Sequence, residues 1–474
     1  MSGIAFGKPL GSTPSPIPGL VVFDLPVHGD NRGWFKENWQ REKMVALGLP
    51  DFGPVQNNIS FNDAVGTTRG IHAEPWDKWV SVATGRIYGA WVDLREGPSF
   101  GTVFTIELDP SRAVFVPRGV GNSYQTLEPD TAYTYLVNDH WSPDASYSFL
   151  NLADPDVAID WPIPLAAAEI SAKDAAHPRL GEVNPIPPRK TLVIGSTGQL
   201  GRAIRAEFGD SARFEWASRQ ELDLGRGDLR HARKWRDYDT IINAGAYTAV
   251  DLAETPEGRH QAWAANAAGP AALAAIAAEF GLTLIHVSSD YVFDGAAQEP
   301  YAEDAPLAPL GVYGQSKAAG DVAIATATRH YVLRTSWVIG EGRNFVRTMQ
   351  SLAERGVDPD VVDDQFGRLT FTSDLARGIR HLLEVRPPYG TYNLTSTGDP
   401  MSWADVARHV FTLVGADPAR VTGVSTDTYF ASATLPVAPR PRNSVLSLDA
   451  IEATGFHPGD AVERLRSYLD QSGS

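Results

Sequence analysis

Tyr313 and Lys317 stand four residues apart in the segment GVYGQSKAAGD, residues 311–321. On a helix this spacing places both side chains on one face. A tyrosine with its ordinary pKa of about 10 is a poor acid–base group at neutral pH, and a nearby ammonium favours the phenolate and lowers that pKa. The pair could therefore give a proton to a ketone oxygen during reduction. Ser288 and Ser289 end an apolar run upstream, where a hydroxyl can hold the same oxygen. The alternative is a chance pair on a solvated helix.

A glycine-rich turn precedes this pair in the chain. In TLVIGSTGQLGRAIRAEF, residues 191–208, an apolar run leads into glycines at 195, 198 and 201 and then into a helical pattern. Glycines let the backbone approach a pyrophosphate, and the N-terminus of the following helix offers unpaired N–H groups to the anion. Because the alternation of apolar runs and helical stretches continues along the chain, we interpret the turn as a dinucleotide site rather than a purely structural turn.

A second group of residues that can transfer protons lies in the first third of the chain. TTRGIHAEPWDKWVSV contains Arg69, His72 and Lys78, DTAYTYLVNDHWSP contains Tyr135, and SAKDAAHP contains Asp174. Histidine is the natural base near pH 7, and a cation stabilises the enolate that forms when a proton is removed beside a ketone. These residue types suit proton transfer at carbon. The alternative for a lone histidine is a hydrogen-bonded core residue.

The elements that must hold these residues differ between the two halves. Residues 1–165 contain short aromatic and β-branched runs such as GTVFTIEL and AVFVP, which indicates an all-β sandwich or barrel. From Lys190 apolar runs alternate with helical stretches, which indicates a parallel α/β sheet. The segment NPIPPRK, residues 184–190, suits a stiff extended linker. We predict two domains, residues 1–185 and 190–474.

Composition limits the classes of function. The chain has 474 residues, too many for one ordinary core, and its formal net charge of −16 argues against a nucleic-acid-binding surface. The absence of cysteine excludes disulfides, thiolate nucleophiles and cysteine-ligated zinc. The N-terminal segment MSGIAFGKPLGSTPSPIPGL lacks the apolar core of a signal peptide, and the alanine-rich run WAANAAGPAALAAIAAEF is more typical of a buried helix than of a membrane span. We expect a cytoplasmic protein that binds neither nucleic acid nor membranes.

The second half resembles the dTDP-4-dehydrorhamnose reductases of the extended short-chain dehydrogenase/reductase superfamily. The resemblance covers essentially all of residues 190–474 and rests on segments in the family's order: TLVIGSTGQLGRAI, ELDL, NAGAYTAVDLAE, HVSSDYVFDG, YGQSKAAGD, LRTSWVIGEGRNFV, DDQFGRLT and PRPRNSVL. It implies a Rossmann-type α/β fold in which Ser289, Tyr313 and Lys317 are catalytic. The coenzyme-binding residues that it implies are Gly195, Thr197, Gly198, Gln199, Leu200, Asp223, Leu224, Asn243, Ala244, Gly245, Tyr313 and Lys317.

The sequence of this half gives fewer signals for the choice of coenzyme and for the residues that bind substrate. Arg219 stands where a 2′-phosphate could lie, and no acidic residue occurs from Trp216 to Gln220, which favours NADPH while leaving NADH open. Arginines suit a diphosphate because their planar fork binds two oxygens, although a single arginine is more often a surface charge. The candidates for substrate binding are Trp337, Asn344, Gln365, Arg368, Arg440 and Arg442.

The first half, over residues 20–180, resembles the dTDP-4-dehydrorhamnose 3,5-epimerases, which implies a cupin-type β-barrel, or jelly roll. Under this resemblance His72 is the base, Asp174 orients its imidazole, Lys78 polarises the C4 carbonyl and Tyr135 donates a proton on the far face of the sugar. Arg69 is a candidate for the diphosphate. Further candidates for binding the base or the sugar are Gln56, Asn58, Asn122 and Trp141.

Two positions affect the expected epimerase chemistry. Related epimerases often carry a histidine where Asn122 stands, and an asparagine cannot shuttle protons, so epimerisation at C3 alone stays open. Many cupins bind a metal through several histidines and a carboxylate, but GIHAEPW holds only His72, followed by Glu74. We predict no metal.

Together the two resemblances predict a bifunctional enzyme that makes dTDP-L-rhamnose. It would epimerise dTDP-4-dehydro-6-deoxy-D-glucose at C3 and C5 and then reduce the C4 ketone with NADPH. The alternatives are a C3-epimerase joined to a 4-ketoreductase of another deoxysugar pathway, and a regulatory protein that binds nucleotide sugars. We expect a homodimer formed through the epimerase half.

Overall fold

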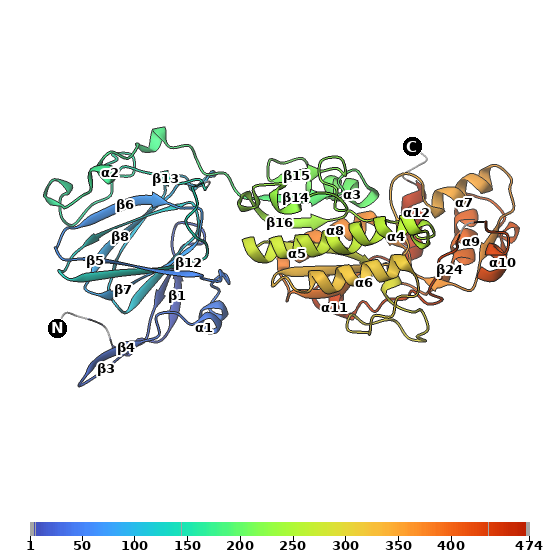
Figure 1. Ribbon diagram of the computed structural model, residues 1–474, viewed down its shortest axis with the longest axis horizontal. Coiled ribbons are helices and arrows are strands. Elements are labelled where there is room, and N and C mark those ends of the chain that lie inside the picture. Colours follow the sequence, from blue (N-terminus) through green and yellow to red (C-terminus); the bar gives the residue numbers. More distant parts are fainter. Residues whose placement is uncertain (1–3, 5, 144, 435, 471–474) are drawn as a thin grey trace. The chain divides into compact units, whose positions relative to one another are not determined.

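The computed structural model describes residues 4, 6–143, 145–434 and 436–470, and its chain divides into two compact units, Met1–Pro188 and Arg189–Ser474 (Figure 1). The proline-rich segment between them is partly tied to the first unit. The N–H of Ile186 donates to the carbonyl of Leu94, and the N–H of Glu96 donates to the carbonyl of Ile186, both at 2.8 Å. The expected stiff linker is therefore shorter than NPIPPRK, because Ile186 pairs with Arg95 in an isolated β-bridge and Lys190 already belongs to the first strand of the second unit.

The first unit consists of two antiparallel sheets, which confirms the expected all-β jelly roll. Apolar side chains from the inner faces of both sheets, among them Val80, Trp91, Val114 and Tyr133, form the core between them. The first sheet has the order β1 (Gly11–Pro14), β2 (Val21–Asp24), β10 (Arg112–Val116), β7 (Lys78–Thr84), β12 (Thr131–Val137) and β5 (Gln56–Asn62). The second has the order β13 (Ser148–Phe149), β6 (Thr68–Ala73), β11 (Val120–Thr126), β8 (Ile87–Asp93) and β9 (Val103–Leu108).

Smaller elements complete the first unit. A hairpin is formed by β3 (Val27–Asp30) and β4 (Gly33–Lys36), and helix α1 spans Arg41–Ala46. The short helix α2 (Ala172–Ala175) follows the strands. It begins at Ser171, whose hydroxyl accepts a hydrogen bond from the N–H of Asp174 at 3.0 Å. This N-cap fixes the backbone of the aspartate that the sequence singled out.

The second unit is built on a six-stranded parallel sheet, as expected for a Rossmann-type fold. Its order is β15 (Phe214–Ala217), β14 (Lys190–Ile194), β16 (Tyr238–Asn243), β17 (Thr283–Ser289), β18 (His330–Thr335) and β23 (Gly390–Asn393). The chain starts at β14, adds β15 on one side and then crosses to β16 on the other. The carboxyl ends of β14 and β16 therefore flank the switch point at which such sheets bind ligands.

Helices cover both faces of this sheet (Figure 1). Helices α3 (Gln199–Phe208) and α8 (Thr372–Val385) pack on one face, and α5 (Gly269–Phe280) and α6 (Val312–Ile324) pack on the other. The alanine-rich run begins at the last residue of α4 (Pro256–Trp263) and forms the π-helix η6 (Ala264–Ala268) and α5. Its Leu273 and Ile276 are buried, whereas Trp263 is 42% exposed. Among the described residues, we find no helix with the length and hydropathy that a membrane crossing requires.

A smaller lobe packs beside the carboxyl ends of the parallel strands. It has its own core, formed by α7 (Phe345–Glu354), α9 (Trp403–Leu413) and α12 (Ala461–Asp470). Three separate strand pairs contribute residues to this core: β19 (Val338–Ile339) with β22 (Thr370–Phe371), β20 (Asp360–Val362) with β25 (Thr422–Val424), and β21 (Phe366–Gly367) with β24 (Met401–Ser402). Helix α10 (Thr426–Phe430) lies in this lobe, whereas α11 (Asp449–Ala453) packs against the parallel sheet, where Ile451 is buried in the core beside β18 and β23.

Candidate active sites

His72 and Asp174 form the centre of the site in the first unit. His72 Nε2 lies 3.0 Å from Asp174 Oδ1, and the other carboxylate oxygen accepts a hydrogen bond from the N–H of Gly70 at 3.1 Å. Burial opposes ionisation of Asp174, but the hydrogen bonds from Gly70 and His72 outweigh it and lower its pKa. The carboxylate therefore stays charged and holds one imidazole nitrogen, which leaves Nδ1 as the nitrogen that can exchange a proton.

His177 is a neighbour of this pair that the sequence reasoning missed. It is buried, its ring lies against that of His72 at 5.4 Å between centroids, and its Nε2 is 3.7 Å from Asp174 Oδ1. Burial and the nearby His72 lower the pKa of His177, so it is neutral near pH 7. The nitrogen and oxygen atoms of His72, Asp174 and His177 lie close enough to hold a metal ion. The available signal was the segment KDAAH, which places His177 three residues after Asp174 and just beyond the end of α2.

Lys78 and Tyr135 approach from the opposite sheet. Lys78 is buried on β7 and forms an ion pair with Glu74, and its Nζ lies 5.5 Å from the centre of the Tyr135 ring. Burial and Glu74 raise the pKa of Tyr135, while Arg69 lowers it, so Tyr135 is a proton donor at neutral pH. The structure thus gathers a base, a cation and an acid, with Glu74 as a partner of the cation that the sequence did not predict.

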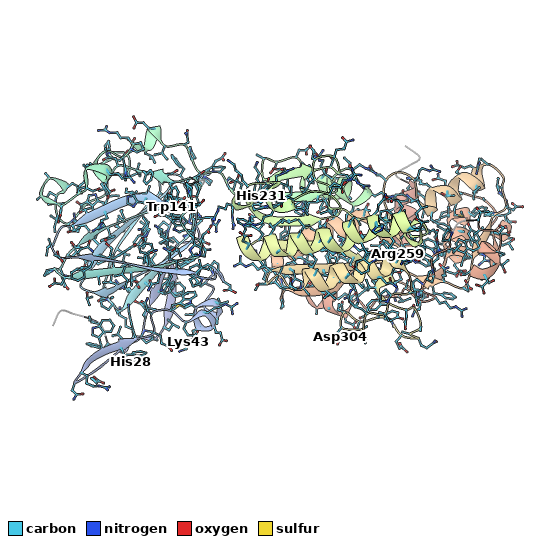
Figure 2. The ribbon with its side chains drawn as sticks, viewed as in Figure 1. His28, Lys43, Trp141, His231, Arg259 and Asp304 are labelled. Carbon is cyan, nitrogen blue, oxygen red and sulfur yellow. The ribbon has the colours of Figure 1, made fainter. Side chains whose placement is uncertain are left out.

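The candidates for binding substrate in the first unit differ in their exposure and in their hydrogen-bond partners. Arg69 Nε donates to Asn62 Oδ1 at 3.0 Å, and Gln56 Nε2 donates to Asn58 Oδ1 at 2.8 Å on the edge strand β5. Trp141 is 70% exposed and stands on the surface (Figure 2).

Asn122 differs from the other candidates because it is bound inside the barrel. It lies opposite His72 in the pairing of β11 with β6, and its Oδ1 accepts hydrogen bonds from Trp91 Nε1 at 2.9 Å and Tyr133 Oη at 3.1 Å. Its carbonyl group therefore supports the core below the site.

In the second unit, a cavity of about 610 Å³ lies at the carboxyl ends of β14 and β16. The sequence-predicted residues that line it are Gly195, Thr197, Gly198, Gln199, Leu200, Arg219, Asp223, Leu224, Ala244, Gly245, Ser289, Tyr313, Lys317 and Trp337. The glycine turn, the Tyr–Lys helix and the serine strand thus meet around one space, although they come from separate segments of the chain.

The glycine turn leaves room for a ligand at the start of α3. Gly195 has φ +79°, and a Cβ there would lie 2.7 Å from the backbone nitrogen of Gly245, so only glycine fits. Gly198 is the N-cap of α3 and offers no side chain to the first N–H groups of the helix. These donors are available to an anion. At the far side of the cavity, Arg219 Nε lies 3.4 Å from Asp223 Oδ2.

Helix α6 places Tyr313 against the serine strand. Gly314 permits this contact, because a Cβ there would lie 2.2 Å from the carbonyl oxygen of Tyr291. Burial, followed by the charge of Asp290, raises the pKa of Tyr313 to about 12, while a hydrogen bond with Ser289 lowers it. The expectation that Lys317 lowers the pKa of Tyr313 is wrong for this structure. Burial dominates, and it also lowers the pKa of Lys317 to about 8.

Asp290 and Trp403 belong to this site but were not predicted. Asp290 follows the serine strand, accepts a hydrogen bond from Ser289 Oγ at 3.0 Å, and has a pKa raised to about 6 by burial. Trp403 stacks on Trp337 at 3.8 Å between ring centres, and both line the cavity. Trp337 has φ +46°, a left-handed conformation that is rare for a large side chain.

Six predicted residues lie outside the cavity lining: Asn243, Asn344, Arg440, Gln365, Arg368 and Arg442. Asn243 is buried behind it, and Asn344 is the N-cap of α7, where its Oδ1 accepts a hydrogen bond from the N–H of Arg347. Arg440 is bound to Asp251 at 2.8 Å. In each case the polar group is already engaged by the protein.

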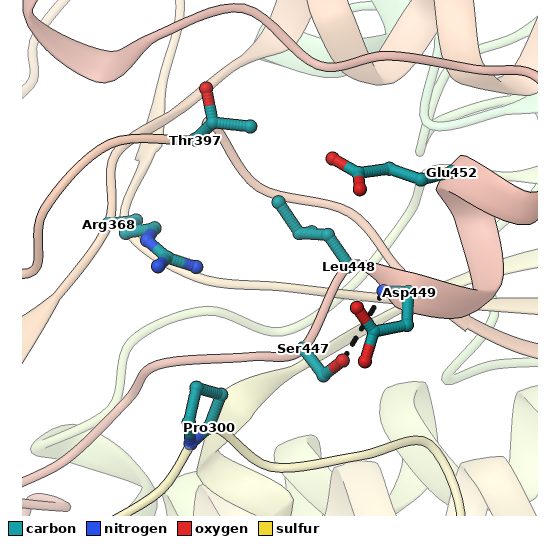
Figure 3. A pocket seen from close by; sticks show the side chains of 7 residues that line it. All are labelled: Pro300, Arg368, Thr397, Ser447, Leu448, Asp449 and Glu452. Carbon is teal, nitrogen blue, oxygen red and sulfur yellow. Dashed lines mark hydrogen bonds between the residues drawn. The ribbon is translucent and has the colours of Figure 1, made fainter.

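The remaining arginine and glutamine candidates are also engaged elsewhere or exposed. Arg368 donates to the backbone carbonyls of Gly398 and Leu446 and faces a separate pocket with Asp449 and Glu452 (Figure 3). Gln365 donates to Thr426 Oγ1 at 2.9 Å, and Arg442 is exposed.

Comparisons with known proteins identify a family for each unit. Residues 189–473 match the model of the RmlD substrate binding domain, and residues 14–182 match that of dTDP-4-dehydrorhamnose 3,5-epimerase. The chain belongs to both families. We refer to its two units below as the epimerase domain and the reductase domain.

Individual relatives cover each domain. The epimerase domain is 51% identical over 197 residues to the protein RmlC homolog of Streptococcus pyogenes, which spans 40% of this chain and 99% of that protein. A dTDP-4-dehydrorhamnose reductase of Sinorhizobium fredii is 36% identical over 276 residues, 56% of this chain and 91% of its own. The crystal structure of the Bacillus anthracis dTDP-4-dehydrorhamnose reductase in complex with NADP matches with a TM-score of 0.55 and 29% identity, over 60% of this chain and 99% of that chain.

Proposed function

We propose that this chain catalyses two consecutive steps of dTDP-L-rhamnose synthesis. The epimerase domain would convert dTDP-4-dehydro-6-deoxy-D-glucose to dTDP-4-dehydro-L-rhamnose by inversion at C3 and C5, and the reductase domain would reduce the C4 ketone with NADPH. The observation that carries the proposal is the presence of two sets of residues in one chain, the His72–Asp174 pair with Lys78 and Tyr135, and the cavity with Ser289, Tyr313 and Lys317.

In the epimerase domain, His72 removes the proton from the carbon beside the ketone. The electron pair of the broken C–H bond moves into the enolate, whose oxygen is stabilised by the ammonium of Lys78. Tyr135 then gives a proton to the same carbon from the opposite face, and proton exchange with solvent restores both groups. The ion pair of Lys78 with Glu74 holds the lysine in place within the barrel.

In the reductase domain, the residues present fit a dinucleotide. The glycine turn and the free N–H groups of α3 would hold its diphosphate, Asp223 and Leu224 would contact the adenosine, and Arg219 supports NADPH over NADH. When bound, NADPH supplies a hydride to the ketone carbon. Ser289 holds the ketone oxygen, and Tyr313 donates the proton that this oxygen requires. In the complex with coenzyme, the ammonium form of Lys317 would favour the resulting phenolate, an effect that burial outweighs in the free protein.

We also propose that the chain forms a homodimer through the epimerase domain. β5 is an edge strand, and its Ile59 and Phe61 are 67% and 56% exposed. Exposed apolar residues on an unpaired strand edge favour pairing with a second copy. Analytical ultracentrifugation should show a dimer for the wild type and a monomer for Ile59→Lys/Phe61→Glu. A monomeric wild type would contradict this assignment.

Product analysis tests the function. The purified chain is incubated in heavy water with dTDP-4-dehydro-6-deoxy-D-glucose, first alone and then with NADPH, and both mixtures are followed by NMR. We expect deuterium at C3 and C5 without NADPH and dTDP-L-rhamnose with it. Deuterium at C3 alone, or a C4 alcohol of the other configuration, would replace the proposal with the synthesis of another deoxysugar. Unchanged substrate in both mixtures would exclude an enzyme of this pathway.

A further inference from the structure

His286 is a buried residue of the reductase domain that has no part in the reaction as proposed. It lies on β17, between the end of β16 and helix α6, and is 1% exposed. Its Nδ1 is 3.0 Å from Asn243 Nδ2, and its Nε2 is 3.4 Å from Lys317 Nζ. The imidazole therefore connects the turn beside the cavity to the lysine of the active site.

The direction of the hydrogen bonds along this connection is set at its far end. The N–H of Gly245 donates to Asn243 Oδ1 at 3.1 Å, so the amide of Asn243 turns its NH₂ group toward His286. An NH₂ group can only donate, which makes His286 Nδ1 the acceptor. Burial and the neighbouring Lys317 lower the pKa of His286 well below its ordinary value, so the ring is neutral. Its one proton is therefore on Nε2, the nitrogen that faces Lys317.

The N–H group at Nε2 of His286 therefore points toward Nζ of Lys317. An ammonium has three donors and no acceptor, so it cannot accept a hydrogen bond from His286, whereas a neutral amine can. Lys317 Nζ does donate to the backbone carbonyl of Val287 at 2.6 Å. The lysine is 2% exposed, so water does little to support its charge, in agreement with a pKa lowered to about 8 by burial.

The other ionisable groups nearby do little to restore this charge. Asp321, one turn further along α6, favours the ammonium, but its carboxylate is already bound to Arg334 of β18 at 2.9 Å. Tyr313, one turn earlier, has a raised pKa and is neutral. Asp290, which follows β17 in the short helix η7 (Asp290–Val292), acts on Tyr313 and is itself hydrogen-bonded to Ser289.

We propose that His286 is a positioning residue that opposes the charged form of Lys317 in the free reductase domain, and that coenzyme binding restores this charge with uptake of a proton. The inference rests on the proposed function, because it takes the cavity as the coenzyme site. A bound dinucleotide brings phosphate charge and hydroxyl acceptors into the cavity that Lys317 lines, and both favour an ammonium. Lys317 would thus be charged in the complex, where it is needed beside Tyr313.

Proton uptake can be measured directly on the full chain. NADPH is titrated into the protein by calorimetry at pH 8.5 in two buffers that differ in ionisation enthalpy, and the difference in heat gives the number of protons taken up. At this pH a phosphate with a second pKa of about 6 stays ionised, so the coenzyme itself contributes little. We expect a net uptake of several tenths of a proton that declines toward pH 7, where Lys317 is already charged.

Three variants test whether the proton uptake depends on His286 and Lys317. His286→Phe keeps a ring but removes the N–H, and should move the pH of greatest uptake upward by about one unit, as expected for removal of one unfavourable polar neighbour. Lys317→Met should abolish the uptake while NADPH binding is still detected by fluorescence. His330→Phe, at the start of β18, is the matched control and should behave as the wild type. If His286→Phe does not fold by circular dichroism, His286→Asn, which is too short to reach Lys317, takes its place.

The outcomes separate this inference from the function on which it rests. NADPH binding without net proton exchange would overturn the inference and leave the coenzyme site intact. Uptake that is the same in the wild type and in the His286 variants would remove His286 from the account. If NADPH did not bind at all, both the inference and the proposed reductase function would fail.

Discussion

His72 and Asp174 lie 102 residues apart in the chain, and their side chains meet at 3.0 Å. The pair joins a strand in the middle of one sheet to a four-residue helix that follows the last strand. Because the carboxylate is also fixed by the N–H of Gly70, it can hold the imidazole in one orientation. Asp174 thereby determines which nitrogen of His72 is available as the base.

Removing either member of this pair should stop proton exchange at carbon. We expect His72→Asn to lower deuterium incorporation by about 10²–10⁴-fold, the usual contribution of a general base. Asp174→Asn keeps the shape but not the charge, and should reduce the rate because the imidazole loses the carboxylate that orients it. NADPH oxidation with dTDP-4-dehydro-L-rhamnose supplied directly should be unchanged in both variants. Exchange at the wild-type rate in His72→Asn would assign the base elsewhere.

Tyr313→Phe should abolish reduction selectively. The variant keeps the buried ring but has no proton to give to the ketone oxygen, so we expect kcat for NADPH oxidation to fall by about 10²–10⁴-fold. Deuterium exchange by the epimerase domain serves as the internal control and should continue at the wild-type rate. Coenzyme oxidation at an undiminished rate would show that another group protonates the product.

Arg219→Ala should weaken the preference for NADPH. The guanidinium lies at the edge of the cavity beside Asp223 and can pair with a 2′-phosphate. Loss of one exposed charge-assisted contact should raise the KM for NADPH about tenfold and leave that for NADH within about twofold. Steady-state kinetics with both coenzymes checks this. Equal changes in KM for the two coenzymes would indicate that Arg219 does not contact the 2′-phosphate.

Asp290 should make the reductase domain lose stability as the pH rises. Burial raises its pKa from 3.8 to about 6, so the folded state binds more protons than the unfolded state between these values. The favourable term is complete below pH 4 and is lost as the pH rises through 6, by about 3 kcal/mol for a shift of this size. In urea unfolding at pH 4 to 7, Asp290→Asn should flatten this decline relative to the wild type. Parallel curves for the two proteins would show that Asp290 does not titrate in this range.

The buried ion pair between Asp321 and Arg334 gives a further stability prediction. Both side chains are at most 6% exposed. Asp321→Asn leaves the guanidinium without a compensating charge and should lower the free energy of unfolding of the reductase domain by about 3–5 kcal/mol. The matched control is Glu341→Gln, which breaks the exposed pair with Arg202 and should change it by less than about 1 kcal/mol. Equal small effects in urea unfolding would mean that water reaches the buried pair.

Local spacing determined much of this protein without any tertiary information. The four-residue spacing of Tyr313 and Lys317 predicts that both side chains lie on the same face of a helix. The glycine turn between a strand and a helix predicts a dinucleotide-binding site. The alternation of apolar residues separated the two fold classes, because side chains repeat every two residues on strands and every 3.6 on helices. The order of the motifs indicated both families.

Only the tertiary structure decided which groups have neighbours from distant segments and how deeply they are buried. The contact of His177 with Asp174 and that of His286 with Lys317 depend on how strands and helices pack, and no interval in the sequence encodes the second of them. The pKa of Tyr313 moved opposite to the expectation because burial, a property of the folded chain, outweighed the charge four residues away. Arg440 and Asn344 were likewise assigned to ligands by residue type, but the fold supplies them with protein partners. A polar side chain forms hydrogen bonds or ion pairs with the groups that chain packing places beside it. The sequence alone does not show which groups these are.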